Sequence, residues 1–432
     1  MTTTQQKQGG NIVGIVTMIF LFGMIGFVTN LAAPIGTIWN GQFASLGMLG
    51  NLMNFVAYLF MGIPAGKLLT KIGYKKTALA AIAIGLVGIF VQFLSGKVGG
   101  SAVLGFSVYL AGAFIAGLCV CLLNTVVNPM LNLLAGAGNK GNQMIQIGGS
   151  FNSLMGTLAP MVVMAMVGEV VGSSISQVDP VLYLAMGVFA LTFVALLFIP
   201  LKEIHKGVET KKFERSPWAF RHFVLGAVAI FVYVGVEVGI PGTILYWFSD
   251  TVNGAGLPLE TAAGTAGVVA AMYWLLMLVG RFLGGVVGGK VSSRAMMICA
   301  TGIAALLVFA AIIIPSSVRM SMPAFSFTGG FSMVPNVPLS ALLFVLCGLC
   351  TSVMWGAIFN LATEGLGKYI PLASGIFMMM VVGGGIIPFA QQQLGRVVGY
   401  LDSYWLPLAG ILYMFFYAVA GCKNVNKDIK VD

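Results

Sequence analysis

The sequence predicts an all-α membrane protein whose twelve transmembrane helices form two six-helix halves, and three observations support this fold class. Of the 432 residues, 59% are hydrophobic and only 8% are charged, whereas about 25% of the residues in a soluble domain are charged. Apolar runs long enough to cross a bilayer recur along the whole chain. A basic segment at residues 201–222 divides these runs into two sets of six.

The individual elements follow from the length of each apolar run, since a helix needs about 20 apolar residues to cross the bilayer core. Six runs precede the basic segment, at 12–39, 46–70, 75–95, 101–134, 142–168 and 180–200. Six follow it, at 219–248, 262–288, 294–315, 338–364, 370–395 and 403–421. We therefore predict an N-terminal bundle over 1–200, a cytoplasmic linker over 201–218 and a C-terminal bundle over 219–432.

The distribution of Lys and Arg predicts how the helices are oriented. If the N-terminus is cytoplasmic, only Lys97, Arg319 and Arg396 of the 22 cations fall on the other side. Cytoplasmic loops carry an excess of Lys and Arg, so we expect a multi-pass protein of the cell inner membrane with both termini in the cytoplasm. The net charge of +10 then reflects orientation in the lipid bilayer, and we expect no binding of nucleic acid.

The residue types that usually carry catalysis or bind metals are scattered. His205 and His222 both lie in the basic segment, and the six cysteines lie in or at the ends of apolar spans. We therefore expect no metal site, no cofactor and no catalytic residues. A membrane enzyme such as a lipid-linked glycosyltransferase would need clustered acids or histidines, and an ATP-driven pump would need a motif such as a P-loop; the sequence has neither.

An internal repeat supports the division into halves. The segment "GKLLTKIGYKK" begins at Gly66 after the second span, and "GRFLGG" begins at Gly280 at the end of the eighth. The two segments are separated by close to half of the chain, and each opens with a glycine and a cation at a cytoplasmic helix end. Two similar halves are typical of transporters in which the halves rock about a site at the membrane midplane.

Several segments together resemble one family of membrane proteins. In chain order they are "IPAGKLLTKIGYKK" (63–76), "NTVVNPML" (124–131), "GGSFNSLMG" (148–156), "FVYVGVEVGI" (231–240), "GRFLGG" (280–285) and the segment 348–388. In this order and spacing the chain resembles the major facilitator superfamily and, within it, the fucose–galactose–glucose:proton symporter family. The resemblance covers nearly the whole chain. It implies the major facilitator fold and proton-coupled transport of a sugar by alternating access.

The chain departs from that family at three positions. Members typically carry a glutamate where this chain has Asn124, and an aspartate where it has Asn30. They also carry a glutamine where this chain has Gly149, although Gln146 lies one turn earlier. In relatives the two acids are thought to handle the coupled proton or the sugar. Because both are amides here, the family's account of proton coupling does not transfer directly.

Amide side chains predict a polar cavity wall in the N-terminal half. Asn124 and Asn128 are four residues apart and therefore share one helix face, and amides can both donate to and accept from sugar hydroxyls. The alternatives are hydrogen bonds between helices and, for Asn128, bonds to backbone groups freed by Pro129. We predict substrate contacts for Asn30, Asn54, Asn124, Asn128, Gln146 and Asn152.

Glu237 is the most informative charge, because it alone among the acids falls in the middle of a predicted span. Ionisable residues inside the membrane are costly and usually functional. We predict that Glu237 binds and releases the coupled proton; the alternatives are sodium binding, a contact to a sugar hydroxyl, and a structural hydrogen bond to Tyr233. We expect Tyr233, Trp355 and Asn360 to complete the substrate site.

Basic residues at cytoplasmic helix ends predict a gate. Lys67 and Arg281 each follow a glycine of the internal repeat, and a cation there can pair with an acid or with a helix C-terminus of the other half. We predict that Lys67, Arg281 and Glu364 close the cytoplasmic side, while the alternative is that these cations only set orientation. The glycines at 383–385 predict a helix bend or close helix packing.

These patterns together favour a secondary active transporter for a monosaccharide or a related small hydroxylated solute. We expect the energy to come from a proton gradient, with sodium symport and uncoupled uniport as alternatives. A membrane sugar sensor on the same fold is the non-transporting alternative. We expect a monomer whose partners are the sugar, the coupled proton and the lipid bilayer.

Overall fold

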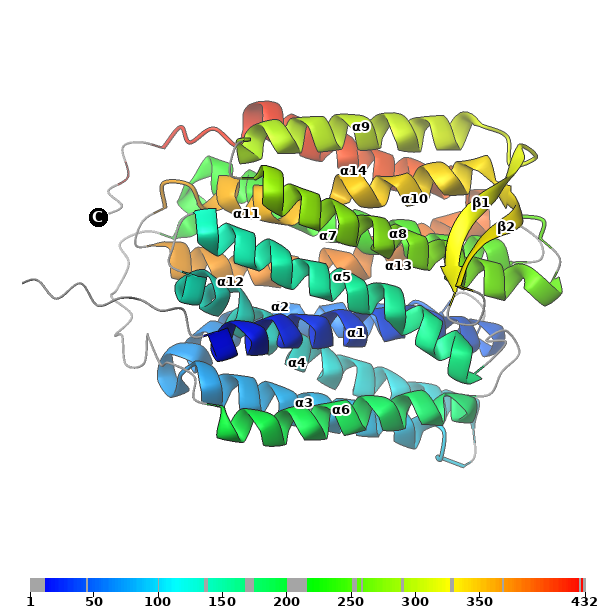
Figure 1. Cartoon of the computed structure of the whole chain (residues 1–432), viewed down its shortest axis with the longest axis horizontal. Coiled ribbons are helices and arrows are strands. Elements are labelled where there is room, and N and C mark those ends of the chain that lie inside the picture. Colours follow the sequence, from blue (N-terminus) through cyan, green and yellow to red (C-terminus); the bar gives the residue numbers. More distant parts are fainter. Residues whose placement is uncertain are drawn as a thin grey trace, which may run out of the picture.

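The computed structural model consists of long helices that run side by side (Figure 1). It describes residues 12–43, 46–99, 101–135, 139–167, 175–199, 216–250, 255–257, 259–288, 291–326, 330–366, 369–426 and 429. Residues 201–215 of the predicted linker lie outside this described part. In Figure 1 the helices of the C-terminal half lie mostly in the upper part of the picture and those of the N-terminal half mostly in the lower part.

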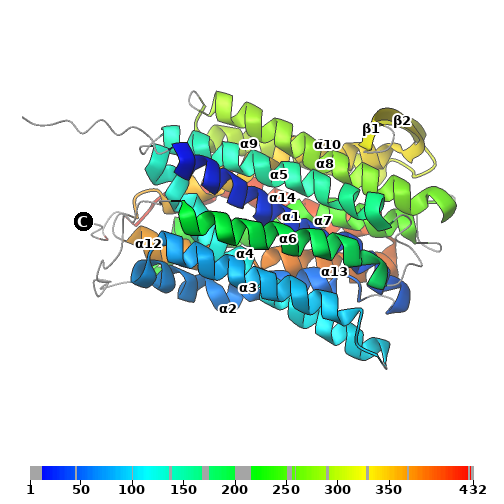
Figure 2. The same ribbon diagram turned by 60° about the horizontal axis from the view of Figure 1, so that its bottom comes forward.

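The N-terminal half consists of six long helices and one short turn. The long helices are α1 (Ile12–Gln42), α2 (Leu49–Ile72), α3 (Tyr74–Ser95), α4 (Ala102–Ala135), α5 (Asn139–Val167) and α6 (Asp179–Phe198), with the 3-10 turn η1 (Ile175–Val178) before α6. Small residues allow them to pack closely, as membrane helices require: Gly88 of α3 lies against Ala116 of α4. Figure 2 shows α3 and α6 next to each other in this half, in agreement with their contacts.

The C-terminal half has the same number of spans, but two of them are broken. Its elements are η2 (Pro217–Ala219), α7 (Arg221–Ser249), α8 (Leu259–Val287), α9 (Ser293–Ile313), α10 (Leu339–Thr351), α11 (Met354–Thr363), α12 (Ile370–Met380), α13 (Gly383–Val398), η4 (Asp402–Tyr404), α14 (Trp405–Phe416) and the π-helical turn η5 (Tyr417–Gly421).

The structure confirms the predicted fold class. Within the described residues, eleven helical segments are long and apolar enough to cross a membrane, and α10 with α11 makes a twelfth span that is bent by 41°. Large apolar side chains such as Leu191 and Leu306 are exposed on the outside of the bundle. That surface suits contact with lipid tails, which are as apolar as these side chains.

The two halves meet along a small set of helix pairs. α5 packs against α8, α2 packs against α12 and α13, and α1 contacts α7. In terms of spans, the fifth contacts the eighth and the second contacts the eleventh. A pseudo-twofold axis that relates the halves would superimpose one of these pairs on the other. Such repeats place the substrate site at the interface of the halves, so this interface is the place to look for it.

The glycines at 383–385 produce both of the predicted effects. The eleventh span is interrupted between Met380 and Gly383, where α12 ends and α13 begins. A Cβ atom on Gly383 would overlap the backbone oxygen of Phe231 in α7, and one on Gly385 would lie 2.9 Å from Cβ of Phe55 in α2. The lack of side chains therefore lets α13 approach a helix of each half.

The structure contains a β-hairpin that the sequence analysis did not predict. β1 (Arg319–Ser326) pairs antiparallel with β2 (Gly330–Pro338) and contacts α8 and α10 at one end of the bundle (Figure 1). Arg319 donates from Nη1 to the backbone oxygen of Asn336 (2.9 Å) and from Nη2 to that of Ala255, shortly after α7. We call this end, where the last turns of α1, α7 and α13 also lie, the hairpin end.

Candidate functional site

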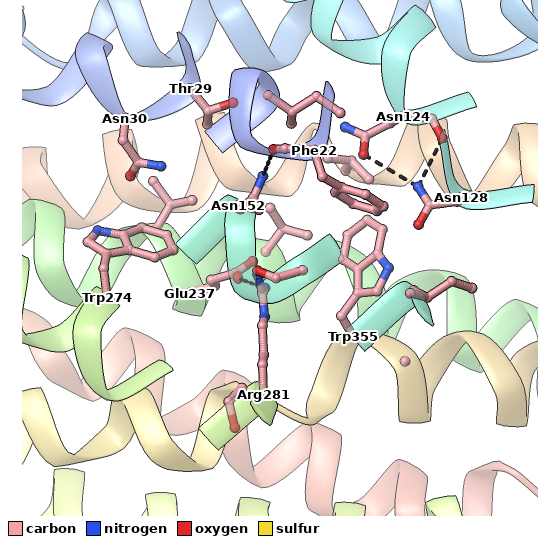
Figure 3. A pocket seen from close by; sticks show the side chains of 18 of the residues that line it. Phe22, Thr29, Asn30, Asn124, Asn128, Asn152, Glu237, Trp274, Arg281 and Trp355 are labelled. Carbon is pink, nitrogen blue, oxygen red and sulfur yellow. Dashed lines mark hydrogen bonds and ion pairs between the residues drawn. The ribbon is translucent and has the colours of Figure 1, made fainter. Parts of the chain in front are cut away.

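A cavity lies at the interface of the two halves and is lined by both. It has a volume of about 100 Å³ and is bordered by α1, α2, α4 and α5 from one half and by α7, α8, α11 and the break after α10 from the other. Figure 3 shows its side chains at close range. Because the lining residues come from both halves, a solute in the cavity would contact both halves at once.

An ion pair lies in the wall formed by the C-terminal half. Nη2 of Arg281, on α8, donates to Oε1 of Glu237, on α7, over 2.9 Å, and both side chains are about nine-tenths buried. A buried charge is stable only when it is paired and hydrogen-bonded. Figure 3 shows the pair between the indoles of Trp274 and Trp355. The pair therefore supplies two charges to the cavity without giving it a net charge.

Arg281 also joins the two halves. Its Nη1 donates to the backbone oxygen of Gly149 over 2.6 Å and to the hydroxyl of Ser153 over 2.9 Å, and both acceptors lie on α5. A single guanidinium thus binds a carboxylate of the C-terminal half and two oxygens of the N-terminal half. Gly149 leaves room for it, since a Cβ atom there would lie 3.3 Å from Cδ of Arg281.

This position of Arg281 differs from the sequence-based prediction, which placed the residue in a cytoplasmic gate. The side chain is 7% exposed and lines the cavity. The physical reason is the direction of helical side chains, which point toward the N-terminus of their own helix. A long side chain near the end of α8 therefore extends back toward the middle of the bundle.

The predicted amides form most of the wall in the N-terminal half. Asn30, Asn124, Asn128, Gln146 and Asn152 all line the cavity. Asn30, Asn124 and Asn128 each donate one amide N–H to a partner within the protein. Every amide also carries an oxygen and a second N–H. The wall can therefore still offer hydrogen-bonding groups to a solute.

The partners of these amides differ from helix to helix. Nδ2 of Asn124 donates to the hydroxyl of Tyr58 (2.7 Å), and Nδ2 of Asn128 donates to the backbone oxygen of Asn124 (2.9 Å). Nδ2 of Asn30 donates to Gly26 O (2.8 Å), one turn earlier in the same helix. The contact of Asn128 is to the carbonyl of residue 124, and not to that of residue 125, which Pro129 leaves without its helical donor.

Four other predicted substrate and gate residues lie outside the cavity lining. Asn54 is buried in α2, and Tyr233 is fully buried behind the cavity, where its hydroxyl donates to the backbone oxygen of Thr351 over 3.2 Å. Lys67 and Glu364 are exposed near the end of the bundle opposite the hairpin end, and the backbone oxygen of Glu364 lies 2.9 Å from Nε2 of His222.

Asn360 also differs from its prediction as a substrate ligand. It is exposed near the end of α11, and its Nδ2 lies 3.5 Å from the hydroxyl of Ser293 at the start of α9. The spacing within α11 explains the difference, because five residues separate Asn360 from Trp355 and turn it by about 140° around the helix axis. Trp355 lies just after the break and faces the cavity, whereas Asn360 lies more than one turn further toward the end of the span.

The structure adds lining residues that the sequence did not single out. Phe22 and Thr29 lie on the same face of α1 as Ile25, and Ser352 lies at the break after α10. Helical spacing from Asn30 would have suggested parts of the α1 face. No pattern in the sequence marks the break that places Ser352 in the wall.

Comparisons with known proteins agree with this architecture. A model of the Major Facilitator Superfamily matches residues 13–390. A glucose/galactose transporter of Brucella abortus is 27% identical over 98% of this chain and 97% of its own length. A putative glucose/galactose transporter of Helicobacter pylori is 27% identical over 94% and 95%. A crystal structure of the Escherichia coli fucose:proton symporter has a TM-score of 0.70 and 17% identity, and the match covers 95% of this chain and 98% of that chain.

Proposed function

The chain belongs to the Major Facilitator Superfamily, and from that premise we propose that it is a secondary active transporter for a monosaccharide or a related small hydroxylated solute. The observation that carries this proposal is the cavity shared by both halves, whose polar wall consists mainly of amides. A site at the interface of two halves is what alternating access requires, because rocking of the halves exposes it to either side in turn.

The chemistry of the cavity favours a neutral solute. Asn30, Asn124, Asn128, Gln146 and Asn152 can donate to and accept from hydroxyl groups, while Trp274 and Trp355 offer apolar faces to the C–H groups of a sugar ring. The charges of Glu237 and Arg281 neutralise each other over 2.9 Å. A charged solute would meet no unpaired counter-charge in this ion pair. The sugars named for the Brucella and Helicobacter relatives fit this class.

Proton coupling would act through Glu237 and Arg281. A protonated Glu237 would lose its ionic attraction to Arg281, and Arg281 also holds α5 of the other half through Gly149 and Ser153. Binding of a proton would therefore change a contact between the halves. This arrangement would supply a coupling route in a chain that has Asn30 and Asn124 at the two positions where the family resemblance implies acids.

The orientation and the gate follow from the charges at the ends of the bundle. Lys67, Lys71, Lys75 and Lys76 lie at the end opposite the hairpin end, and Lys- and Arg-rich loops face the cytoplasm. We propose that the protein lies in the inner membrane of the cell. In this orientation the hairpin end faces the outside and both termini lie in the cytoplasm. Lys67 and Glu364 remain candidates for a cytoplasmic gate. Because one chain completes the cavity, a monomer suffices.

The test is uptake of a panel of labelled sugars into proteoliposomes with imposed proton or sodium gradients. We expect accumulation driven by an inward proton gradient and unaffected by sodium. Glu237→Gln should abolish that accumulation yet retain exchange of labelled for unlabelled sugar. Uptake that ignores both gradients would establish uniport, and binding without exchange would establish a sensor. If Glu237→Gln still accumulates sugar, the coupling residue is wrong.

A further inference from the structure

Polar side chains that carry at least one unpaired atom collect where the two halves touch at the hairpin end. Thr243 and Tyr246 lie near the end of α7, and Gln391 and Gln392 lie near the end of α13. We call these four residues the seam cluster. Each is at most 2% exposed. Within the described residues, the hydroxyls of Thr243 and Tyr246, both amide atoms of Gln391 and Oε1 of Gln392 have no hydrogen-bond partner.

Two members of the seam cluster, Tyr246 and Gln392, lie directly against the N-terminal half. Cβ atoms built on Gly36 in α1 and on Gly47 after it would lie 2.9 Å and 3.1 Å from the hydroxyl of Tyr246. Nε2 of Gln392 donates to Oδ1 of Asn40 over 3.2 Å. These contacts close the halves against each other at the hairpin end, so Tyr246 and Gln392 become accessible only when the halves separate there.

The unpaired groups are unfavourable in the closed arrangement. A buried polar group without a partner costs about 1–3 kcal/mol, and more than about 90% of such groups in proteins are paired. Closure alone would be served better by apolar side chains of similar size. The chemistry of the cluster therefore suits a conformation in which the seam is open and these groups have partners.

We propose that the seam cluster is a second binding site for the hydroxyl groups of the transported solute, formed when the halves separate at the hairpin end. This inference rests on the proposed sugar transport. Two glutamine amides and two hydroxyls offer both donors and acceptors without charge, which matches a neutral polyhydroxylated solute. The solute would contact this site on its way from outside to the central cavity, and not on its way from the cytoplasm.

The test compares sugar with its monodeoxy analogues on the two sides of the membrane. Initial rates in right-side-out and inside-out vesicles give an outer and an inner KM for each analogue. In the unmodified protein, we expect removal of at least one hydroxyl to raise the outer KM several-fold more than the inner KM. In Gln392→Leu that side-specific preference should disappear, since the group that recognises the hydroxyl is gone.

Analogue discrimination separates binding from a change in conformational balance. A substitution that only shifts the population of outward-open molecules changes the outer KM of every analogue by the same factor. Equal factors for all analogues would therefore overturn the proposal, as would equal changes on the two sides. A seam that holds only water would leave the preference of the unmodified protein intact in Gln392→Leu, and this too would overturn it.

Two further variants serve as a second test and as a control. Tyr246→Phe removes only a hydroxyl that has no partner in the closed seam, so it should fold and still reduce the side-specific preference. Ser340→Ala removes another buried, unpaired hydroxyl, at the start of α10 and outside the seam cluster, and it should leave both KM values unchanged. If the unmodified protein transports no sugar at all, that result contradicts the proposed function itself. Loss of the second binding site alone would leave transport intact.

Discussion

At the scale of single residues, the pairing of Glu237 with Arg281 predicts an asymmetric response to mutation. Arg281→Met leaves the carboxylate of Glu237 buried without its partner, and breaking a buried pair in this way costs about 3–5 kcal/mol. The double variant Glu237→Gln/Arg281→Met has no unpaired charge and should recover much of that loss. Thermal unfolding in detergent measures both. A double variant no more stable than Arg281→Met would contradict a direct pairing.

Gly149 predicts a second residue-scale effect, this time on transport. Gly149→Val places methyl groups where the guanidinium of Arg281 now lies, since even a Cβ would be 3.3 Å from its Cδ. Arg281 then loses its hydrogen bonds to α5, and bonds of a charged donor contribute about 1.5–3 kcal/mol each. We expect initial transport rates to fall about tenfold or more. The control is Gly187→Val in α6, where a Cβ meets no atom within 4 Å; equal rates in both variants would refute the effect.

The predictability of the site also differs residue by residue. Asn124, Asn128 and Glu237 line the cavity, and each is conspicuous in the sequence as a polar group within an apolar run. Their roles in substrate binding and proton coupling stay predictions. Arg281 was assigned to the gate because a cation at the end of a span resembles an orientation signal, and the sequence does not report how far a side chain reaches back. Asn360 lies outside the cavity lining because it follows Trp355 by five residues in α11 and therefore lies on a different face of that helix.

At the scale of elements, the long spans were predictable and the breaks within them were not. Length and hydrophobicity define a span such as α7 directly. The bend after Thr351 and the hairpin at 319–338 depend on contacts with other helices. The hairpin sequence "RMSMPAFSFTGGFSMVPNVP" contains a Gly-rich turn signal between two short segments. Because it lies between two predicted spans, it was interpreted as a connecting loop.

The junction of α12 and α13 predicts a further effect at this scale. Gly383→Ala introduces a methyl group against the backbone oxygen of Phe231, which cannot move without shifting α7. Overpacking of this kind costs about 1–3 kcal/mol. We expect a lower unfolding temperature in Gly383→Ala than in the control Gly187→Ala. A variant as stable as its control would show that α7 and α13 can separate freely at this point.

At the scale of the whole molecule, the contacts between halves fall into two groups with different roles. The pairs α5–α8 and α2–α12/α13 exchange under the pseudo-twofold relation and flank the cavity on opposite sides. The contact of α1 with α7 near the hairpin end instead lies close to the axis that relates the halves. Rocking of the halves can preserve the flanking pairs while this contact opens, so the seam at the hairpin end is where motion should be largest.

That reasoning predicts the effect of fixing the seam. Asn40 and Gln392 come from opposite halves and are joined by a hydrogen bond of 3.2 Å, so cysteines at both positions can be bridged by a short thiol-reactive cross-linker. The substitutions are made in a background without native cysteines, because Cys299 is exposed. Bridging should stop net transport while sugar still binds from the side opposite the hairpin end, and a cleavable cross-linker should restore transport on reduction. Asn40→Cys alone is the control. Continued transport by the bridged protein would mean that the halves do not separate at this seam, and alternating access would then need a different moving contact.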